Sequence, residues 1–245
     1  MDQKTLDRKI REAIRLYWAT RQSQHARQGA ADGSKDTGKR AAVTGGAHID
    51  GFIELVKELL VESGLSDAEV LVSRRSAILP GYFRPTKQWD LLAISGNSLI
   101  GIIEFKSQVG PSFGNNFNNR VEEALGNATD LWTAYREGVF RPSSRPWLGY
   151  FMLLEDSSGS TTPVKVDEPN FKVLDVFRKS SYAERYRIFC ERLILERLYD
   201  SACLLMSSQE GAQLGDYSEP SPELSFRNFT ASLMGRATAF AKMRE

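Results

Sequence analysis

The chain has 245 residues, of which 41% are hydrophobic and 26% charged, and its 32 Lys and Arg nearly balance its 31 Asp and Glu. A chain of this length can bury a substantial core, and a net charge of +1 excludes a protein that binds polyanions through bulk charge alone. No apolar run approaches membrane-spanning length and no signal peptide opens the sequence, so we expect a soluble, cytoplasmic protein that forms a single domain over residues 1–245.

The N-terminal part of the chain is locally basic. Residues 1–45 contain ten Lys or Arg against five Asp or Glu, and the stretch from about 26 to 47 is rich in Gly, Ala, Ser and Lys without apolar periodicity. This composition predicts a flexible segment. Such a segment can be an arm that orders on phosphates or an ordinary solvated loop, and the sequence favours neither alternative.

The core is expected between residues 48 and 155, where apolar periodicity alternates between that of helices and that of strands. Gly64 supplies a natural stop for the first helix. The expected elements are a helix over 48–63, a strand over 69–73, a basic loop over 74–88, a β-hairpin over 89–107, a loop over 110–119, a helix over 120–137 and a buried strand over 147–154.

The hairpin carries charges at the ends of two short apolar strands. Asp90 precedes the first strand, turn-forming residues occupy positions 95–98, and Glu104 and Lys106 end the second strand. Two carboxylates can hold Mg²⁺, and an ammonium can lie beside the water that attacks a phosphodiester, so this layout is typical of a metal-dependent nuclease. The alternative is structural: a solvated end of an edge strand and an incidental acid at the start of its neighbour.

The nuclease interpretation depends on the register of the hairpin. Glu104 and Lys106 are two residues apart and must face the same side of their strand. An odd-numbered loop, such as residues 96–98, places Asp90 opposite Glu104, whereas a two-residue loop turns Asp90 to the other face. We predict the odd loop.

The C-terminal part, from about 181 to 243, is expected to be mostly helical. One apolar stripe runs at helical spacing over 182–205, where core or dimer packing is its expected use, and a second helical segment covers 224–243. Cys190 and Cys203 both fall within the first pattern. We therefore expect buried small hydrophobic residues rather than a disulfide.

The order of elements, with an acid on the second strand and E-x-K on the third, resembles the PD-(D/E)xK nuclease core. The resemblance implies an α/β (α+β) fold with a restriction-endonuclease-like core, in which a mixed β-sheet is flanked by helices, and additional C-terminal helices. The usual Pro-Asp start is loosened, because Pro85 stands five residues before Asp90. The runs similar to the XhoI family of type II restriction endonucleases are RPTKQWDLLAISGNSLIGIIEFKSQVGPSFGNNFNNRVEEALGNATDLW and PNFKVLDVFRKSSYAERYRIFCERL.

For that family the resemblance implies a homodimer that cuts double-stranded CTCGAG with Mg²⁺ and leaves staggered ends. Asp90 and Glu104 are expected as carboxylate ligands, with the backbone carbonyl of Phe105 as a third ligand by resemblance. Lys106 completes the catalytic set, because it would orient the attacking water, and the products would carry 5′ phosphate and 3′ hydroxyl groups. A cognate DNA methyltransferase is expected as a genomic neighbour rather than as a bound subunit.

Further residues can support the site and read the DNA. An outer-shell acid can come from the 48–63 helix, although most of its acids should be solvated. The candidates for DNA contact are Arg74, Arg75, Arg84 and Lys87 before the hairpin, and Gln108, Asn115, Asn116, Asn118, Asn119 and Arg120 after it. Arg suits guanine, and Asn or Gln suits adenine. The arginines can equally clamp phosphates, and the asparagines can equally serve turns or cap a helix.

Two other functions compete with restriction. A structure-specific or repair nuclease would share the fold and cut branched or damaged DNA, whereas a non-catalytic DNA-binding or assembly protein would use E-x-K structurally. Zinc and HNH chemistry lack their residues, because His25 and His48 are the only histidines and no Cys or acid stands at suitable spacing. No Gly-rich loop followed by Lys-Ser or Lys-Thr offers an ATP site.

Overall fold

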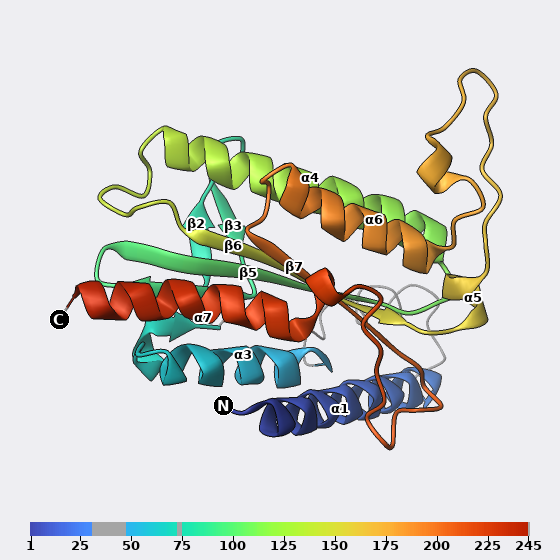
Figure 1. Ribbon diagram of the computed structural model, residues 1–245, viewed down its shortest axis with the longest axis horizontal. Helices are drawn as coiled ribbons and strands as arrows, with labels where there is room; N and C mark the ends of the chain where they lie inside the picture. Colours follow the sequence, from blue (N-terminus) through green and yellow to red (C-terminus); the bar gives the residue numbers. More distant parts are fainter. Residues whose placement is uncertain (31–47, 73–74, 245) are drawn as a thin grey trace.

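A mixed five-stranded β-sheet lies at the centre of the computed structural model, which describes residues 1–30, 48–72 and 75–244 (Figure 1). Its strands, in spatial order, are β1 (Val70–Leu71), β4 (Leu91–Ser95), β5 (Ser98–Gln108), β6 (Trp147–Glu155) and β7 (Ser201–Ser207). The pairs β1–β4 and β4–β5 are antiparallel, and β5, β6 and β7 run parallel to one another. Helices provide the connections that the parallel strands require.

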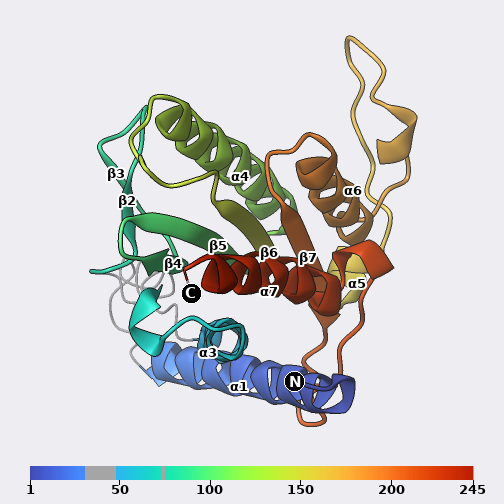
Figure 2. The ribbon, with the colours of Figure 1, turned by 60° about the vertical axis from the view of Figure 1, so that its left-hand side comes forward.

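Helices cover both faces of the sheet (Figures 1 and 2). One layer consists of α4 (Phe113–Arg136) and α6 (Tyr182–Leu195), and the other of α3 (Asp50–Glu62), α7 (Phe226–Met243) and α1 (Gln3–Ala30), which packs against α3. The remaining elements are the short helix α5 (Ser158–Thr161) and the 3-10 turns η2 (Asp67–Glu69), η3 (Asp175–Phe177) and η4 (Pro222–Leu224). Within the described ranges, no helix is long and apolar enough to cross a membrane.

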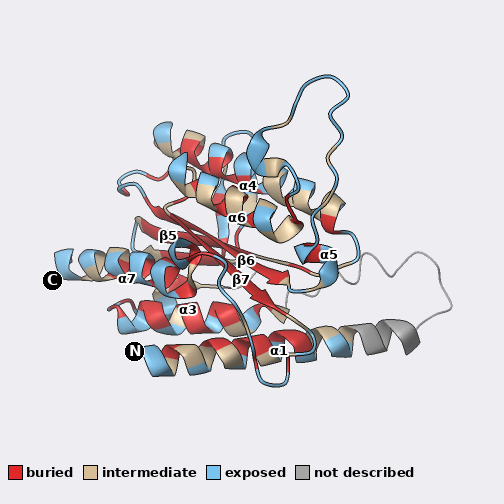
Figure 3. Ribbon diagram, turned by 45° about the vertical axis from the view of Figure 1, so that its right-hand side comes forward, coloured by how far each residue is buried: buried red, intermediate tan, exposed pale blue. Residues whose placement is uncertain are grey.

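The sheet divides the interior into two apolar clusters, and most residues of its strands are buried (Figure 3). Phe52, Ile103 and Phe151 belong to the cluster beneath α1, α3 and α7, while Leu131 and Tyr150 belong to the cluster beneath α4 and α6. Because both faces are covered, β6 and β7 are apolar without the alternation of a half-exposed strand. The side of the sheet that a residue faces therefore decides which helices it meets.

The predicted fold class is confirmed, since a mixed sheet is flanked by helices and further helices follow towards the C-terminus. The expected first core helix is α3, which ends before Gly64. Gly64 has a φ of 98°, and the N–H of Leu65 donates to the carbonyl of Leu60 at 3.3 Å, which closes the helix as a left-handed glycine commonly does. The expected buried strand at 147–154 is β6.

Three expected elements differ from the structure. The basic loop at 74–88 contains an antiparallel pair of short strands, β2 (Ile78–Pro80) and β3 (Thr86–Gln88). Most of the loop expected at 110–119 belongs to α4, which begins at Phe113. The helical stripe expected over 182–205 is wrong beyond α6, because β7 occupies its end and a continuous apolar run buried on both faces carries no period by which a strand can be distinguished from a helix.

The N-terminal segment and the cysteines also require correction. Residues 26–30, expected to be flexible, form the end of α1, and residues 31–47 lie outside the part of the chain that the structure describes. Cys190 on α6 and Cys203 on β7 are free and buried, but they do not share one helix.

Candidate active site

The β4–β5 hairpin brings Asp90 and Glu104 to one face of the sheet by an unexpected route. Its turn has two residues, 96 and 97, so the predicted odd loop is wrong. A β-bulge at Ile100 then gives β5 one residue more than β4, which changes the register before the site is reached. Continued pairing beyond the bulge places Asp90 opposite Glu104, as the nuclease interpretation requires.

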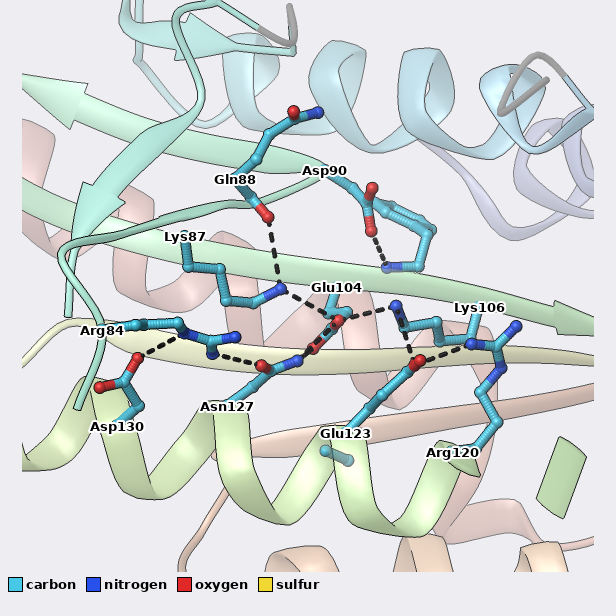
Figure 4. Close-up of polar contacts among 12 residues, drawn as sticks. Arg84, Lys87, Gln88, Asp90, Glu104, Lys106, Arg120, Glu123, Asn127 and Asp130 are labelled. Carbon is cyan, nitrogen blue, oxygen red and sulfur yellow. Dashed lines mark hydrogen bonds and ion pairs between the residues drawn. The ribbon is translucent and has the colours of Figure 1, made fainter. Parts of the chain in front are cut away.

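Glu104 is the centre of a buried network of charges and hydrogen bonds beneath α4 (Figure 4). Only 1% of its surface is exposed. Its Oε1 lies 2.8 Å from Lys106 Nζ and 3.3 Å from Lys87 Nζ, which reaches in from β3. Asn127 Nδ2, on α4, lies 2.9 Å from Oε1 and 2.8 Å from Oε2. Three separate elements therefore hold one carboxylate.

A third acid joins the network from α4. Glu123 Oε2 lies 3.4 Å from Lys106 Nζ and accepts a hydrogen bond from Arg120 Nη1 at 2.8 Å. The sequence suggested that an additional acid would come from the 48–63 helix, but α3 packs on the opposite face of the sheet from Glu104. Glu58 of α3 instead forms an ion pair with Lys9 of α1 at 2.7 Å.

Asp90 lies at the end of β4, beside the main chain of β5. Its Oδ2 accepts a hydrogen bond from the N–H of Phe105 at 2.8 Å. Burial raises the pKa of Asp90 and the Glu104 carboxylate adds to this effect, although Lys106, the Phe105 N–H and Lys87 oppose it. The two acids are thus close enough for each to influence the charge of the other.

The charges of Glu104 and the two lysines depend on one another. Burial acts to raise the pKa of Glu104, but the ammonium groups of Lys106 and Lys87 outweigh it, so this pKa lies below its ordinary value. Burial acts to lower the pKa of Lys106, but attraction to Glu104 raises it overall. For Lys87 burial prevails, helped by repulsion from Lys106, and its pKa is lowered. Glu104 and Lys106 are consequently held as an ion pair.

The donor atoms around Asp90 and Glu104 suit Mg²⁺. In the described ranges, no group of three or more His, Cys, Asp or Glu side chains is arranged to hold a metal. Two carboxylates are nevertheless a normal protein contribution for Mg²⁺, which keeps several waters and prefers oxygen ligands. The Phe105 carbonyl can add a third oxygen, because the N–H and C=O of one strand residue point to the same edge, and its N–H points at Asp90.

The basic residues predicted before the hairpin have different surroundings. Arg74 lies outside the residues that the structure describes, and Arg75 is exposed in the turn before β2. Lys87 is the second ammonium beside the buried glutamate. Arg84 is partly exposed and its Nε lies 2.7 Å from Asp130 Oδ2. Two of the four are therefore anchored at or near the site.

The residues predicted after the hairpin also separate. Gln108 is buried, donating to the Phe113 carbonyl at 3.0 Å and accepting from the Tyr186 hydroxyl. Both ends of its amide are engaged within the protein, and its contact with DNA stays a prediction. The other candidates lie on the first turns of α4, where Asn115, Asn118 and Asn119 are exposed and Asn116 and Arg120 are half-buried. None of the asparagines caps this helix, because Ser112 occupies the N-cap.

Sequence reasoning missed Glu123, Asn127 and Asp130. These residues are spaced by four and three on α4 and therefore share one helix face. Their neighbours on the buried side include Ala124 and Leu131, so polar side chains interrupt an apolar stripe. Buried polar residues on a helix face require partners, so this interruption was a signal that could have found Asn127 and Asp130, whereas Glu123 is exposed and gives no such signal.

The fold and the site together define a class of protein. An acid and an E-x-K motif lie opposite each other on adjacent antiparallel strands of a mixed sheet that helices cover on both faces. This is a restriction-endonuclease-like protein.

Comparison with known proteins gives the family. The model of the family described as restriction endonuclease XhoI matches residues 28–219. The chain belongs to the XhoI restriction endonuclease family and is a type II site-specific deoxyribonuclease that acts on DNA. Restriction is thereby favoured over the repair nuclease and the non-catalytic protein that the sequence left open.

Curated relatives cover most of the chain. Type II restriction enzyme BstVI of Geobacillus stearothermophilus is 53% identical over 205 residues, which are 82% of this chain and 91% of that protein. Type II restriction enzyme XhoI of Xanthomonas vasicola is 42% identical over 197 residues, 80% of this chain and 78% of that protein. Type II restriction enzyme AbrI of Azospirillum brasilense is 48% identical over 166 residues, 68% of this chain and 74% of that protein. No solved structure matches the chain significantly.

Proposed function

We propose that this enzyme cuts both strands of the palindrome CTCGAG in a reaction that depends on Mg²⁺, leaving staggered ends with 5′ phosphate and 3′ hydroxyl groups. One arrangement carries the catalytic part: the pairing of Leu91 with Ile103 brings Asp90 beside Glu104, while Lys106 forms an ion pair with Glu104 at 2.8 Å. The target sequence is proposed from the resemblance to the XhoI family, which membership of that family supports.

Asp90, Glu104 and the carbonyl of Phe105 are the proposed ligands of Mg²⁺. The bound ion would neutralise charge on the phosphoryl oxygens and lower the pKa of the attacking water. The carboxylates are prepared for this task because Glu104 is held ionised by its cationic neighbours, while Asp90 is oriented by the Phe105 N–H at 2.8 Å.

Lys106 is the proposed group that orients the attacking water and stabilises the negative charge of the transition state as an ammonium. Its ammonium has a fixed position between Glu104 and Glu123, at 2.8 and 3.4 Å. Lys87 places a second ammonium beside the same carboxylate, at 3.3 Å. Both cations would stabilise negative charge that develops on a phosphate bound beside Glu104.

DNA recognition is proposed to involve Arg75, Arg84 and the residues of the first turns of α4, namely Asn115, Asn116, Asn118, Asn119 and Arg120, together with Arg74. A palindrome also requires a two-fold homodimer, because two equivalent sites must cut two equivalent strands. The cognate methyltransferase is proposed as a separate protein encoded nearby, which protects the same sequence in the host DNA.

A plasmid assay tests this proposal. With Mg²⁺, we expect a plasmid that carries a single CTCGAG to become linear, and a plasmid with one base pair of the site changed to stay intact. Chelation of Mg²⁺ should stop the reaction. Smeared products would indicate a nuclease without this specificity, and intact DNA over a range of divalent metals would refute the catalytic assignment.

A further inference from the structure

The tip of the β2–β3 hairpin, residues 81–85, is anchored on α4 by a single carboxylate. Asp130 Oδ1 accepts hydrogen bonds from the N–H of Tyr82 at 2.7 Å and of Phe83 at 2.8 Å. Asp130 Oδ2 accepts from Arg84 Nε at 2.7 Å. Three donors on consecutive residues therefore converge on one buried side chain, which fixes the backbone of the tip.

The approach of the tip to α4 is too close for any residue but glycine at its start. A Cβ on Gly81 would lie 2.4 Å from Asp130 Oδ2 and 2.8 Å from the Arg84 carbonyl. The N–H of Gly81 also donates to the Pro85 carbonyl at 3.3 Å, which closes the tip. The sequence GYFRP is thus fitted to this anchored turn.

This rigid tip presents two aromatic side chains to solvent. Tyr82 is 54% exposed and Phe83 is 69% exposed, and their ring centroids lie 5.1 Å apart in an edge-to-face arrangement. Of the aromatic side chains within the described ranges, Phe171 alone is also exposed. The two rings do not contribute to the core of this chain. Their backbone is fixed, but their apolar surfaces remain in contact with water. Adjacent exposed aromatics on a fixed turn are typical of a binding surface.

The tip is connected to the proposed catalytic carboxylate through side chains (Figure 4). Arg84 Nη2 donates to Asn127 Oδ1, and Asn127 Nδ2 donates to both oxygens of Glu104. Lys87, on the strand that leaves the tip, contacts the same glutamate at 3.3 Å. A molecule bound at the tip would therefore lie beside a substrate bound at Glu104.

We propose that Tyr82 and Phe83 contact duplex DNA beside the scissile phosphate, and that the Asp130–Arg84–Asn127 bridge holds this contact in register with Glu104. The inference rests on the proposed nuclease function and adds a contact surface to it. Duplex DNA offers apolar surface in its deoxyribose rings and thymine methyl groups, which aromatic side chains can cover. Arg84 directly follows Phe83 in the sequence, and its side chain is 42% exposed. It supplies positive charge beside the two rings, which suits the phosphates of a bound duplex.

The test is the Tyr82→Ala/Phe83→Ala variant of the full chain. Both side chains are largely exposed, so its thermal unfolding should match that of the unchanged protein. We expect its dissociation constant for a CTCGAG duplex, measured by mobility shift without Mg²⁺, to rise at least about ten-fold, which corresponds to about 1.4 kcal/mol. Single-turnover cleavage with Mg²⁺ should require a correspondingly higher DNA concentration.

Leu214→Ala is the matched control. Leu214 is 69% exposed, like Phe83, but its turn packs against α1, where its carbonyl accepts from Arg15. This variant should bind and cut DNA normally. Unchanged affinity and cleavage in the double variant would overturn the inference while leaving the nuclease function intact. If the unchanged protein binds DNA and the double variant binds it less well, but neither cuts it, the contact stands and the proposed catalysis fails.

Discussion

At the scale of residues, the site centres on one buried acid, Glu104, whose position is fixed by ion pairs and hydrogen bonds from neighbouring side chains. Asn127 illustrates this, because its amide hydrogens reach both oxygens of Glu104 while its carbonyl accepts from Arg84. A neutral amide can orient a carboxylate without cancelling its charge. Such partners of a proposed metal ligand control how well the ligand is placed.

Asn127→Ala should therefore reduce cleavage about 10- to 100-fold and raise the Mg²⁺ concentration needed for half-maximal rate. The reason is that Glu104 loses two oriented hydrogen bonds but keeps its lysines. Single-turnover cleavage at increasing Mg²⁺ measures both effects. Asn115→Ala, at an exposed position on the same helix, should leave the Mg²⁺ dependence unchanged. A variant that is slower at every Mg²⁺ concentration by the same factor would contradict the positioning role.

Asp90→Asn and Glu104→Gln should abolish cleavage while preserving binding to the specific duplex. Each change removes a proposed metal ligand and keeps the shape of the side chain, so the loss is expected in the chemical step rather than in recognition. Mobility shifts and single-turnover cleavage separate the two steps. Substantial cutting by either variant would remove that residue from the metal site.

Asp130 should contribute to stability in a way that depends on pH. Although burial opposes it, the donors from Phe83, Arg84 and Tyr82 hold the pKa of Asp130 below its ordinary value. The folded state then binds fewer protons than the unfolded state, so the contribution is complete above pH 3.8 and falls as the pH drops below that value. Asp130→Asn should lose about 1–3 kcal/mol at pH 7, measured by urea unfolding, and less at pH 3. An equal loss at both values would contradict this account.

At the scale of elements, the sequence predicted strands β1, β4, β5 and β6 and the helices on either side of them, but it missed β7 and the details that orient side chains. The prediction of an odd loop assumed regular pairing along the hairpin. A two-residue turn followed by a bulge at Ile100 also brings Asp90 and Glu104 to one face of the sheet. Bulges leave little trace in an apolar strand, because the extra residue is itself buried. Lys87 was predicted as a DNA contact but not as a neighbour of Glu104, because strands as short as β3 have no period.

Gly81→Ala tests the anchoring of the β2–β3 tip at this scale. The added Cβ would contact Asp130 and the Arg84 carbonyl at impossible distances, so the tip must move away from α4. We expect a loss of about 1–3 kcal/mol in unfolding free energy and slower DNA cleavage. Gly126→Ala provides the control, since Gly126 is exposed within α4 and a Cβ there meets nothing within 4 Å. This control should be stabilised by about 0.5–1 kcal/mol through helix propensity. If Gly81→Ala keeps the unfolding free energy and the cleavage rate of the unchanged protein, the tip is not held as described.

At the scale of the whole molecule, the sheet separates two tasks. The face beneath α4 carries the acids and lysines of the site, while the face beneath α3 and α7 is apolar and is backed by α1, whose Trp18 donates to the buried Ser207 of β7 at 2.6 Å. All the site residues described here come from one chain, so one copy supplies one site. If the enzyme cuts both strands of a palindrome as proposed, we expect a second copy to supply the second site.

A dimer with one inactive subunit makes this expectation measurable. When differently tagged copies of the unchanged chain and of Glu104→Gln are co-expressed and purified through both tags, each mixed dimer should carry one working site. We expect it to nick a supercoiled plasmid at CTCGAG and to accumulate the open circle, whereas the unchanged dimer should pass mainly to linear DNA. Inactive and active subunits share the same recognition residues, so the mixed and unchanged dimers should bind the plasmid with equal affinity. The difference in products must then arise from the number of strands that each dimer cuts. Failure to capture any mixed species, or linear product formed at the unchanged rate, would refute the two-site dimer.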